Sequence, residues 1–532
     1  MKITSHKSKS KWSRFGIMLF VLGAFAFGVF LGQQGIFAAV IARLSTNLNQ
    51  TASEETAVSQ QINVDINFQN YSQILNQRNE ALAQGVYLAN DADFMPATIT
   101  IDGVQLLTQM RLQPGATAQT VDGERWPFEF VVENSPEKQL RHFYLIVAEN
   151  HEHLMEKGYQ ESLAQAGILS TTYALTTLIL NGDDLGTYAI QEHPQSFSFL
   201  TAEQPAGVVV NFNPEVIWQN IAYTNGNATS AIAEPVPNIE RVGWQLMEVN
   251  AVSYNQATVP PEIPLKEQEK EAIQLLQAFQ QNSLPATAVF DVEKYGMFLA
   301  LSDLWGAADA TDLKNLYFYF NPTTGLLEPI GFNGNPQIEN GRINIQNVTF
   351  NDLALQQAYI NALQIVLEPT YLETVQASWE EQHVPAEQQE AVLDRLARQQ
   401  LAIQRSLHPQ QPVLAYYQID KDGANAAIHL DVHNLTNLPV ELVGIDNNAQ
   451  QFIELQPEWL ITSLANDNII LPPFDGQTDL IQLTIPLTVL HNDAFASTNL
   501  QLGTRVLGTE FITYVPIHPR LTPANPTENN NE

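Results

Sequence analysis

The sequence predicts an α+β protein that begins with a transmembrane helix and ends in an all-β Ig-like sandwich. Three observations lead to this prediction. An apolar run follows a basic N-terminal tail, helical and alternating patterns mix from residue 62 to residue 410, and only short alternating segments follow from 411 to 522. At roughly 150 residues per domain, 532 residues correspond to about two to four domains.

The N-terminal region has the features of a signal anchor. Residues 1–14 carry five basic residues and no acid, and residues 15–42 are largely apolar. About 20 apolar residues span a bilayer core, and a basic flank stays in the cytoplasm. We therefore expect a cytoplasmic tail at 1–14, a transmembrane signal-anchor at 15–42 and a linker at 43–61, in a single-pass cell-membrane protein with an extracytoplasmic bulk. A cleaved secretory signal ending near Ala42 is the alternative, and it also exports the chain.

The composition excludes several classes of function. The chain has 57 acidic and 24 basic residues, for a net charge of −33. Such a charge repels nucleic acid and can attract cations or basic protein segments, although an ordinary soluble acidic surface is the favoured explanation. The chain has no cysteine, which excludes disulfides, thiolate nucleophiles and cysteine-ligated zinc.

Helices and strands are expected to alternate irregularly between residues 62 and 410. Asp102-Gly103 after the strand at 98–101 and Asn181-Gly182 between two strand patterns both indicate tight hairpins. Asp291 is placed to cap a helix. Residues 225–264 lack periodicity and are expected to form a long loop. Helices are expected at 71–85, 161–167 (the end of one), 266–282, 291–305, 352–368 and 386–408, and strands at 98–101, 128–132, 175–180, 185–192, 207–212, 316–320 and 326–332.

The pattern changes after Pro412. Strands are expected at 428–433, 440–445, 459–463 and 479–487, and their regular spacing with polar turns is typical of a β-sandwich over 411–522. The polar residues 523–532 are expected to form a disordered tail.

Three motifs between residues 62 and 410 resemble the spore coat protein H (CotH) kinase-like family. The segment 179–192, ILNGDDLGTYAIQE, is similar to the family's Asn-Gly hairpin with its closing Glu. The segment 294–319, KYGMFLALSDLWGAADATDLKNLYFY, resembles its helix and catalytic loop, and 321–335, NPTTGLLEPIGFNGN, resembles the hairpin that ends in a metal-binding Asp. The resemblance implies an atypical protein-kinase-like domain over 62–410.

The resemblance also implies ATP and Mg²⁺ or Mn²⁺ as cofactors. Phosphoryl transfer requires cationic groups for phosphate, a carboxylate for the acceptor hydroxyl, and an Asn and an Asp for the metal. The residues that match these roles are Asp309, with Asp312 as its rival, for the catalytic base; Asn315 and Asn333 for the metal; and Arg111, Arg125 and Glu192 for the nucleotide. Ordinary structural interpretations are a solvated loop for Asp309 and Asn315, a strand pair for Arg125 and a strand-end surface carboxylate for Glu192.

One departure from the family pattern favours an inactive protein. Asn333 stands where the family has its metal-binding Asp, and a neutral amide is a poorer magnesium ligand than a carboxylate. The first hypothesis is thus a pseudokinase that binds a protein partner or a nucleotide at the cell envelope. The second is an active Ser/Thr phosphotransferase with a basic or Ser-rich protein substrate. The third is a structural or adhesive envelope protein that acts through the β-sandwich.

Overall fold

The fold was analysed in a computed structural model. It describes residues 60–133, 141–148, 152–196, 207–227, 247–253, 264–336, 352–382, 384–420, 426–446, 452–460, 469–474, 480–486 and 500–520. Residues 60–532 form one compact unit, so their internal contacts are described together.

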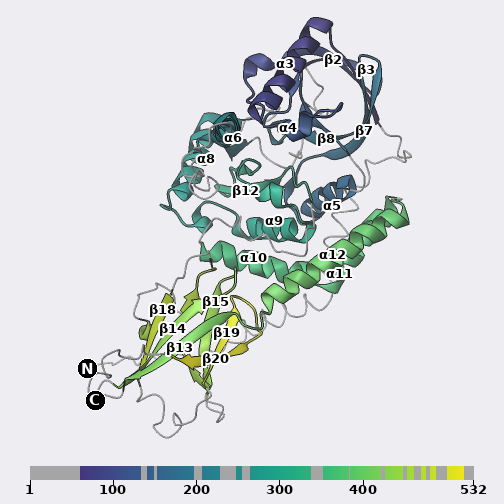
Figure 1. The fold of residues 1–532 in the computed structure, drawn as a ribbon. Helices are drawn as coiled ribbons and strands as arrows, with labels where there is room; N and C mark the ends of the chain where they lie inside the picture. The colour runs from purple at the N-terminus through teal and green to yellow at the C-terminus, as the bar shows by residue number, and fades with distance from the viewer. Residues whose placement is uncertain are drawn as a thin grey trace, which may run out of the picture. The chain divides into compact units, whose positions relative to one another are not determined.

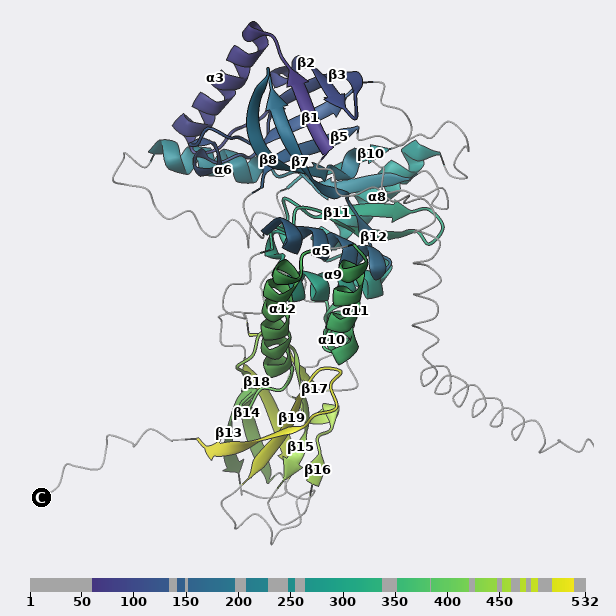
Figure 2. The ribbon, with the colours of Figure 1, turned by 90° about the vertical axis from the view of Figure 1, so that its right-hand side faces the viewer.

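The first part of this unit is a closed barrel of seven strands (Figure 1). Its order is β1-β2-β3-β4-β5-β8-β7, and a parallel pairing of β1 with β7 closes it. Figure 2 shows α3 beside the barrel strands. The strands are β1 (Gln60–Asp65), β2 (Met95–Ile101), β3 (Val104–Leu112), β4 (Phe128–Val132), β5 (His142–Val147), β7 (Tyr173–Leu180) and β8 (Asp183–Glu192), and the helices nearby are α3 (Phe68–Gln84) and α4 (Ala118–Val121).

Two tight turns join barrel strands in the manner that the sequence predicts. Asp102-Gly103 links β2 to β3, and Asn181-Gly182 links β7 to β8. All four residues have positive φ angles between 52° and 90°. Asn, Asp and Gly tolerate this region, and its twist matches the flanking strands. Both hairpins are therefore confirmed.

A five-stranded sheet with helices follows the barrel, in the order β10-β9-β11-β12-β6. Aromatic and aliphatic side chains from β5 of the barrel and from β6, β9, β11 and β12 share one buried cluster, so barrel and sheet pack directly on one another. The strands are β6 (Leu169–Ser170), β9 (Val208–Phe212), β10 (Val249–Ser253), β11 (Tyr317–Asn321) and β12 (Leu326–Gly331).

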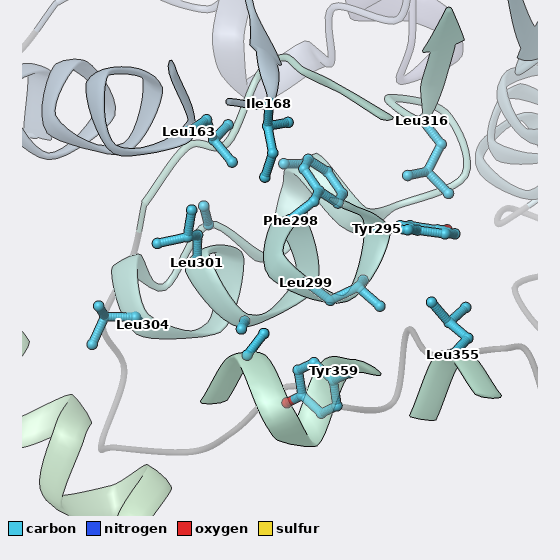
Figure 3. Packing of buried hydrophobic residues seen from close by; sticks show 14 of the residues in the cluster. Leu163, Ile168, Tyr295, Phe298, Leu299, Leu301, Leu304, Leu316, Leu355 and Tyr359 are labelled. Carbon is cyan, nitrogen blue, oxygen red and sulfur yellow. The ribbon is translucent and has the colours of Figure 1, made fainter. Parts of the chain in front are cut away.

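Helix α9 (Val292–Trp305) is the centre of the largest core. Asp291 caps it as predicted, because its carboxylate accepts the N–H of Lys294. Ten of its residues are buried, and Figure 3 shows Tyr295, Phe298 and Leu301 projecting from it, with α10 alongside. The helices that surround this core are α5 (Glu152–Gln165), α8 (Leu265–Gln280), α10 (Leu353–Val366), α11 (Pro369–Glu381) and α12 (Ala386–Leu407).

Residues after Val413 form a β structure around a separate core. The sheet order is β16-β15-β19-β20-β13-β14-β18, with β17 paired to β15 (Figure 2). Strand β20 pairs antiparallel with β19 and parallel with β13, and the strands on both sides of it bury one shared cluster. The strands are β13 (Val413–Asp420), β14 (Ala427–Asn434), β15 (Val440–Asp446), β16 (Phe452–Glu454), β17 (Ile469–Leu471), β18 (Leu480–Pro486), β19 (Gln501–Val506) and β20 (Thr513–Pro519).

The predicted fold class is wrong in its transmembrane helix, which the structure does not support. In the described ranges no helix is both long and apolar enough to cross a bilayer. The apolar helices α9 and α10 have 14 residues each, short of the roughly 20 that a span requires. Helix α12 has 22 residues, but it is amphipathic and buries one side in the core. Residues 15–42 themselves lie outside the described ranges.

Several local predictions also need correction. The expected linker at 43–61 runs into β1, which already begins at Gln60. The expected loop at 225–264 overlaps the end of α6 (Glu215–Asn227) and contains β10, and α11 was not predicted. At the start of the strand expected at 459–463, Trp459 belongs to a 3-10 turn over Pro457–Trp459, and Leu460 makes an isolated bridge to Leu483. Residues 461–463 and the tail at 523–532 lie outside the described ranges.

Candidate functional site

The loop between α9 and β11 holds three of the predicted site residues, Asp309, Asp312 and Asn315. Gly306 ends α9 in the left-handed conformation, with φ of 69°, and lets the chain turn sharply. A short 3-10 helix over Ala308–Thr311 then presents Asp309. The Nδ2 of Asn315 donates to the carbonyl of Asp309 over 2.8 Å, and Asn315 is only 6% exposed. The loop is therefore ordered by its own side chain.

A second loop, which follows β12, closes on the first. Asn333 and Asn335 adopt positive φ angles of 49° and 42° on either side of Gly334. The Nδ2 of Asn335 donates to Oδ2 of Asp309 over 3.0 Å. The structure thus brings Asp309 and Asn315 close to the segment that contains Asn333, and it adds Asn335, which the sequence analysis did not select.

Glu156 is a further acidic group at this place that the sequence analysis missed. It is buried on α5, where its Oε1 accepts the N–H of Gly334 over 3.1 Å and Nε2 of Gln160 over 2.8 Å. Its Oε2 has no hydrogen-bond partner. Burial raises the pKa of Glu156, hydrogen bonds from Gln160 and the Gly334 backbone oppose this shift, and the charge of Asp309 adds to it. The sequence does contain a signal for its burial, because Glu156 lies at helical spacing on the same face of α5 as the apolar residues Tyr159 and Leu163.

A Glu156→Gln variant is expected to be more stable than the wild type at pH 8. The folded state favours protonated Glu156 because its pKa is raised, so the carboxylate destabilises the fold as pH rises above 4.5 through the folded pKa. The amide removes this penalty. Urea denaturation at several pH values should show the gain growing by at most about 1.4 kcal/mol per pH unit and vanishing below pH 4.5. A gain that is independent of pH would contradict this assignment.

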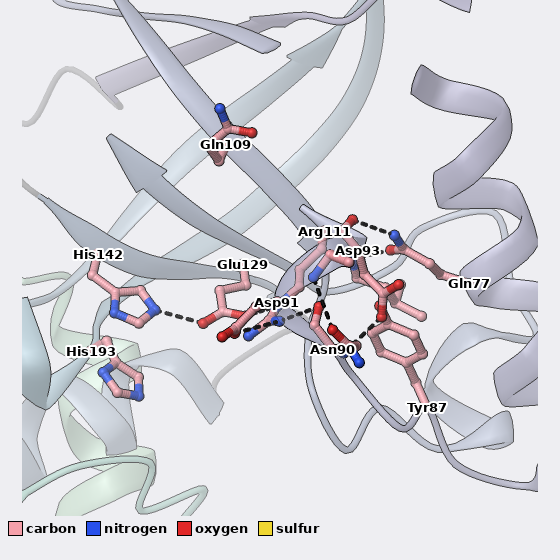
Figure 4. A network of polar contacts seen from close by, with 12 residues as sticks. Gln77, Tyr87, Asn90, Asp91, Asp93, Gln109, Arg111, Glu129, His142 and His193 are labelled. Atoms are coloured by element: carbon pink, nitrogen blue, oxygen red, sulfur yellow. Dashed lines mark hydrogen bonds and ion pairs between the residues drawn. The ribbon is translucent and has the colours of Figure 1, made fainter. Parts of the chain in front are cut away.

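Arg111 does not contact the Asp309 loop, because it is engaged inside the barrel region (Figure 4). Its Nε donates to Oε2 of Glu129 over 2.6 Å, and its NH1 group donates to the carbonyl of Asn90 over 2.9 Å. The side chain is 11% exposed and lies over the ring of Phe94. A phosphate would therefore compete with a buried carboxylate for this guanidinium.

Two of the remaining predicted residues, Arg125 and Glu192, lie outside the Asp309 loop, whereas Asp312 lies within it. Arg125 is half-buried next to the turn at Gly186. Glu192 is fully buried, so the interpretation as a surface carboxylate is wrong, and its Oε1 accepts the hydroxyl of Ser196. Asp312 forms an ion pair with Lys314 at 2.9 Å, which makes it a poorer candidate than Asp309 for a base.

The residues around Asp309 fit a magnesium–nucleotide group poorly. Both positions that would hold the metal, Asn315 and Asn333, are neutral amides, and one oxygen of Asp309 is already bonded to Asn335. Within the described ranges, no group of three or more His, Asp or Glu side chains is arranged to hold a metal ion. Hard cations prefer carboxylates, so the site lacks its main ligand.

Comparisons with known proteins add no family assignment. No family model matches the chain, and a search of the curated proteins gives no significant match. The resemblance to the CotH family stays a prediction from the three motifs.

Proposed function

We propose that this chain is a kinase-like binding protein of the CotH type that does not transfer phosphate. The order of its elements supports this proposal. The Asn181-Gly182 hairpin, the long helix α9, the loop with Asp309 and Asn315, the hairpin β11–β12 and the Asn333 loop follow one another as the three motifs require. The Asp309 loop and the Asn333 loop contact each other through the hydrogen bond from Asn335 to Asp309.

One observation carries the inactive form of this proposal. The carboxylate of Asp309 is held by an amide, and neither metal-holding position has a carboxylate. Phosphoryl transfer depends on metal ions that neutralise charge between the phosphates and on a base that is free to meet the acceptor hydroxyl. Asn333 weakens the first requirement, because only Asn315 matches a metal-holding residue of the family, and Asn335 restricts the second.

The state of Arg111 supports a protein partner rather than a nucleotide. Arg111 would have to leave Glu129, which is 3% exposed, before it met a phosphate. Breaking a buried pair by removing one partner costs about 3–5 kcal/mol. The net charge of −33 favours a basic segment as the partner.

An active phosphotransferase is the second candidate, and the Asp309 loop favours it. Asn315 already orders the Asp309 backbone, and Oδ1 of Asp309 stays available beside the bonded Oδ2. Such a loop needs little rearrangement to orient an acceptor hydroxyl.

Incubation of the full chain with γ-labelled ATP, Mg²⁺ or Mn²⁺ and a basic, Ser-rich acceptor protein tests both candidates. We expect no label transfer above that of an Asp309→Ala variant. We also expect an Asn333→Asp variant to gain metal-dependent stabilisation by ATP in thermal denaturation, because it restores a carboxylate. Asp312→Ala is the matched control. Wild-type transfer that Asp309→Ala abolishes would establish the active kinase instead.

A further inference from the structure

Two histidines stack on each other where the barrel meets the five-stranded sheet. His142 begins β5 and His193 follows β8, and the N–H of His193 donates to the carbonyl of His142. Their ring centroids are 4.1 Å apart and their planes differ by 18°. Figure 4 shows the two rings side by side at one end of the polar network that reaches Arg111. Two positive imidazolium rings at this distance would repel strongly.

His142 is bonded to Glu129, a carboxylate that also contacts Arg111. Its Nε2 lies 2.6 Å from Oε1 of Glu129, whose other oxygen accepts from Arg111. Glu129 is almost completely buried. Each oxygen of this carboxylate therefore already has a basic partner.

His193 is held in its neutral form by its hydrogen bonds. Its Nδ1 accepts the backbone N–H of Gln195 over 3.1 Å, so the ring proton lies on Nε2. Nε2 is 3.3 Å from the hydroxyl of Tyr317, which lies on β11 of the five-stranded sheet. The edges of Tyr144 and Phe332 also contact the ring, which is 5% exposed. His193 thus contacts both barrel and sheet.

We propose that His193 makes the contact between the barrel and the five-stranded sheet pH-sensitive, closed while the ring is neutral and open when the ring takes up a proton. A proton on Nδ1 would face the N–H of Gln195, so the bond to Gln195 would be lost. The new charge would lie against His142 in a buried layer. Opening of the contact separates the ring from Tyr317 and Phe332 and exposes it to water. Water then solvates the charge and replaces the lost hydrogen bond.

Titratable groups face His193 from both the barrel and the sheet, and the two whose charges act on its pKa, His142 and Arg111, both disfavour its protonation. The barrel contributes Arg111, Glu129, His142 and Tyr144, and the sheet contributes Tyr317. The adjacent Glu192 accepts from Ser196 and from the N–H of Thr172.

The electrostatics give the direction of the effect. Burial lowers the pKa of His193 well below 6.5, and the positive charges of His142 and Arg111 lower it further. The unfolded chain takes up this proton near pH 6.5 and the closed state does not. His193 therefore contributes full stability above pH 6.5, and this contribution falls as the pH drops below it.

Hydrogen exchange of the full chain at pH 7.5, 6.5 and 5.5, corrected for chemical exchange rates, tests the proposal. In the wild type we expect protection of β5 and β11 to fall by up to about tenfold per pH unit below 6.5, while β14 and β18 stay protected. His193→Asn keeps an acceptor near Nδ1 but cannot titrate, so it should remove this pH dependence. His518→Asn, an exposed histidine in the C-terminal sheet, should behave like the wild type.

The proposal would be overturned if β5 and β11 lost protection below pH 6.5 equally in the wild type and in His193→Asn. It would also be overturned if β14 of the wild type lost as much protection as β5 and β11. A second measurement does not depend on a variant. In the wild type with ¹³C-labelled histidines, we expect one imidazole to stay neutral below pH 6.5 and to titrate only where β5 and β11 lose protection. Titration of every imidazole near 6.5 would contradict the proposal.

Discussion

A Gly296→Ala variant is expected to lose about 3 kcal/mol of unfolding free energy, the upper range for overpacking a filled core. Gly296 lies within α9, where α10 crosses closely. A Cβ atom at this position would lie 2.5 Å from the backbone carbon of Ala358 and 2.7 Å from the backbone nitrogen of Tyr359. Because these are backbone atoms, no side-chain rotation relieves the clash. The two helices must move apart.

Urea denaturation at pH 7.5 measures this effect. In an unobstructed helix, replacing Gly by Ala stabilises the protein by at most about 1 kcal/mol, because Ala has the higher helix propensity. Here we expect the opposite, a loss of stability. Gly123→Ala is a control, because the nearest atom to its Cβ is 4.0 Å away. Ala358→Gly should not rescue the variant, since the contact involves the backbone. A Gly296→Ala protein as stable as the wild type would show that the helices are less closely packed.

Local elements were predictable because local chemistry determines them. The Asn181-Gly182 turn and the Asp291 cap depend on residues within a few positions of one another. The closed barrel was not predictable in this way. Its closing pair joins Gln60–Val64 to Thr176–Leu180, more than a hundred residues away, and no local pattern encodes that register.

The candidate site likewise contains residues that local sequence predicts and residues that only tertiary packing brings together. The spacing of Asp309 and Asn315 placed them in one loop, and the structure joins them. Asn335 and Glu156 come from other elements, and only the packing of α5 against the loop after β12 brings them there. Glu129 alternates with Phe128 and Phe130, whose side chains enter the barrel core, so the pattern predicts exposure for it. Glu129 is buried instead, where it contacts Arg111 and His142.

Glu129→Gln is expected to lose about 3–5 kcal/mol of unfolding free energy at pH 7.5, because it leaves the buried guanidinium of Arg111 with only the exposed carboxylate of Asp91, 3.9 Å away. Burial alone would raise the pKa of Glu129, but the hydrogen bonds and charges of His142 and Arg111 outweigh it and lower the pKa below 4.5. This contribution is therefore present above pH 4.5 and lost as pH falls through the folded pKa. The difference between wild type and variant should shrink accordingly in strong acid.

Two comparisons separate the loss of a partner from the net value of the ion pair. The double variant Arg111→Met with Glu129→Leu removes both charges, and we expect it to be more stable than Glu129→Gln alone, because apolar replacements of buried pairs are often neutral. Glu441→Gln is the control for a more accessible pair, since Arg505 is 33% exposed, and about 1 kcal/mol or less is expected. A double variant as unstable as the sum of its single changes would contradict this account, because additive effects mean that Arg111 and Glu129 are not energetically coupled. The loss in Glu129→Gln would then come from its other contact, the bond to His142.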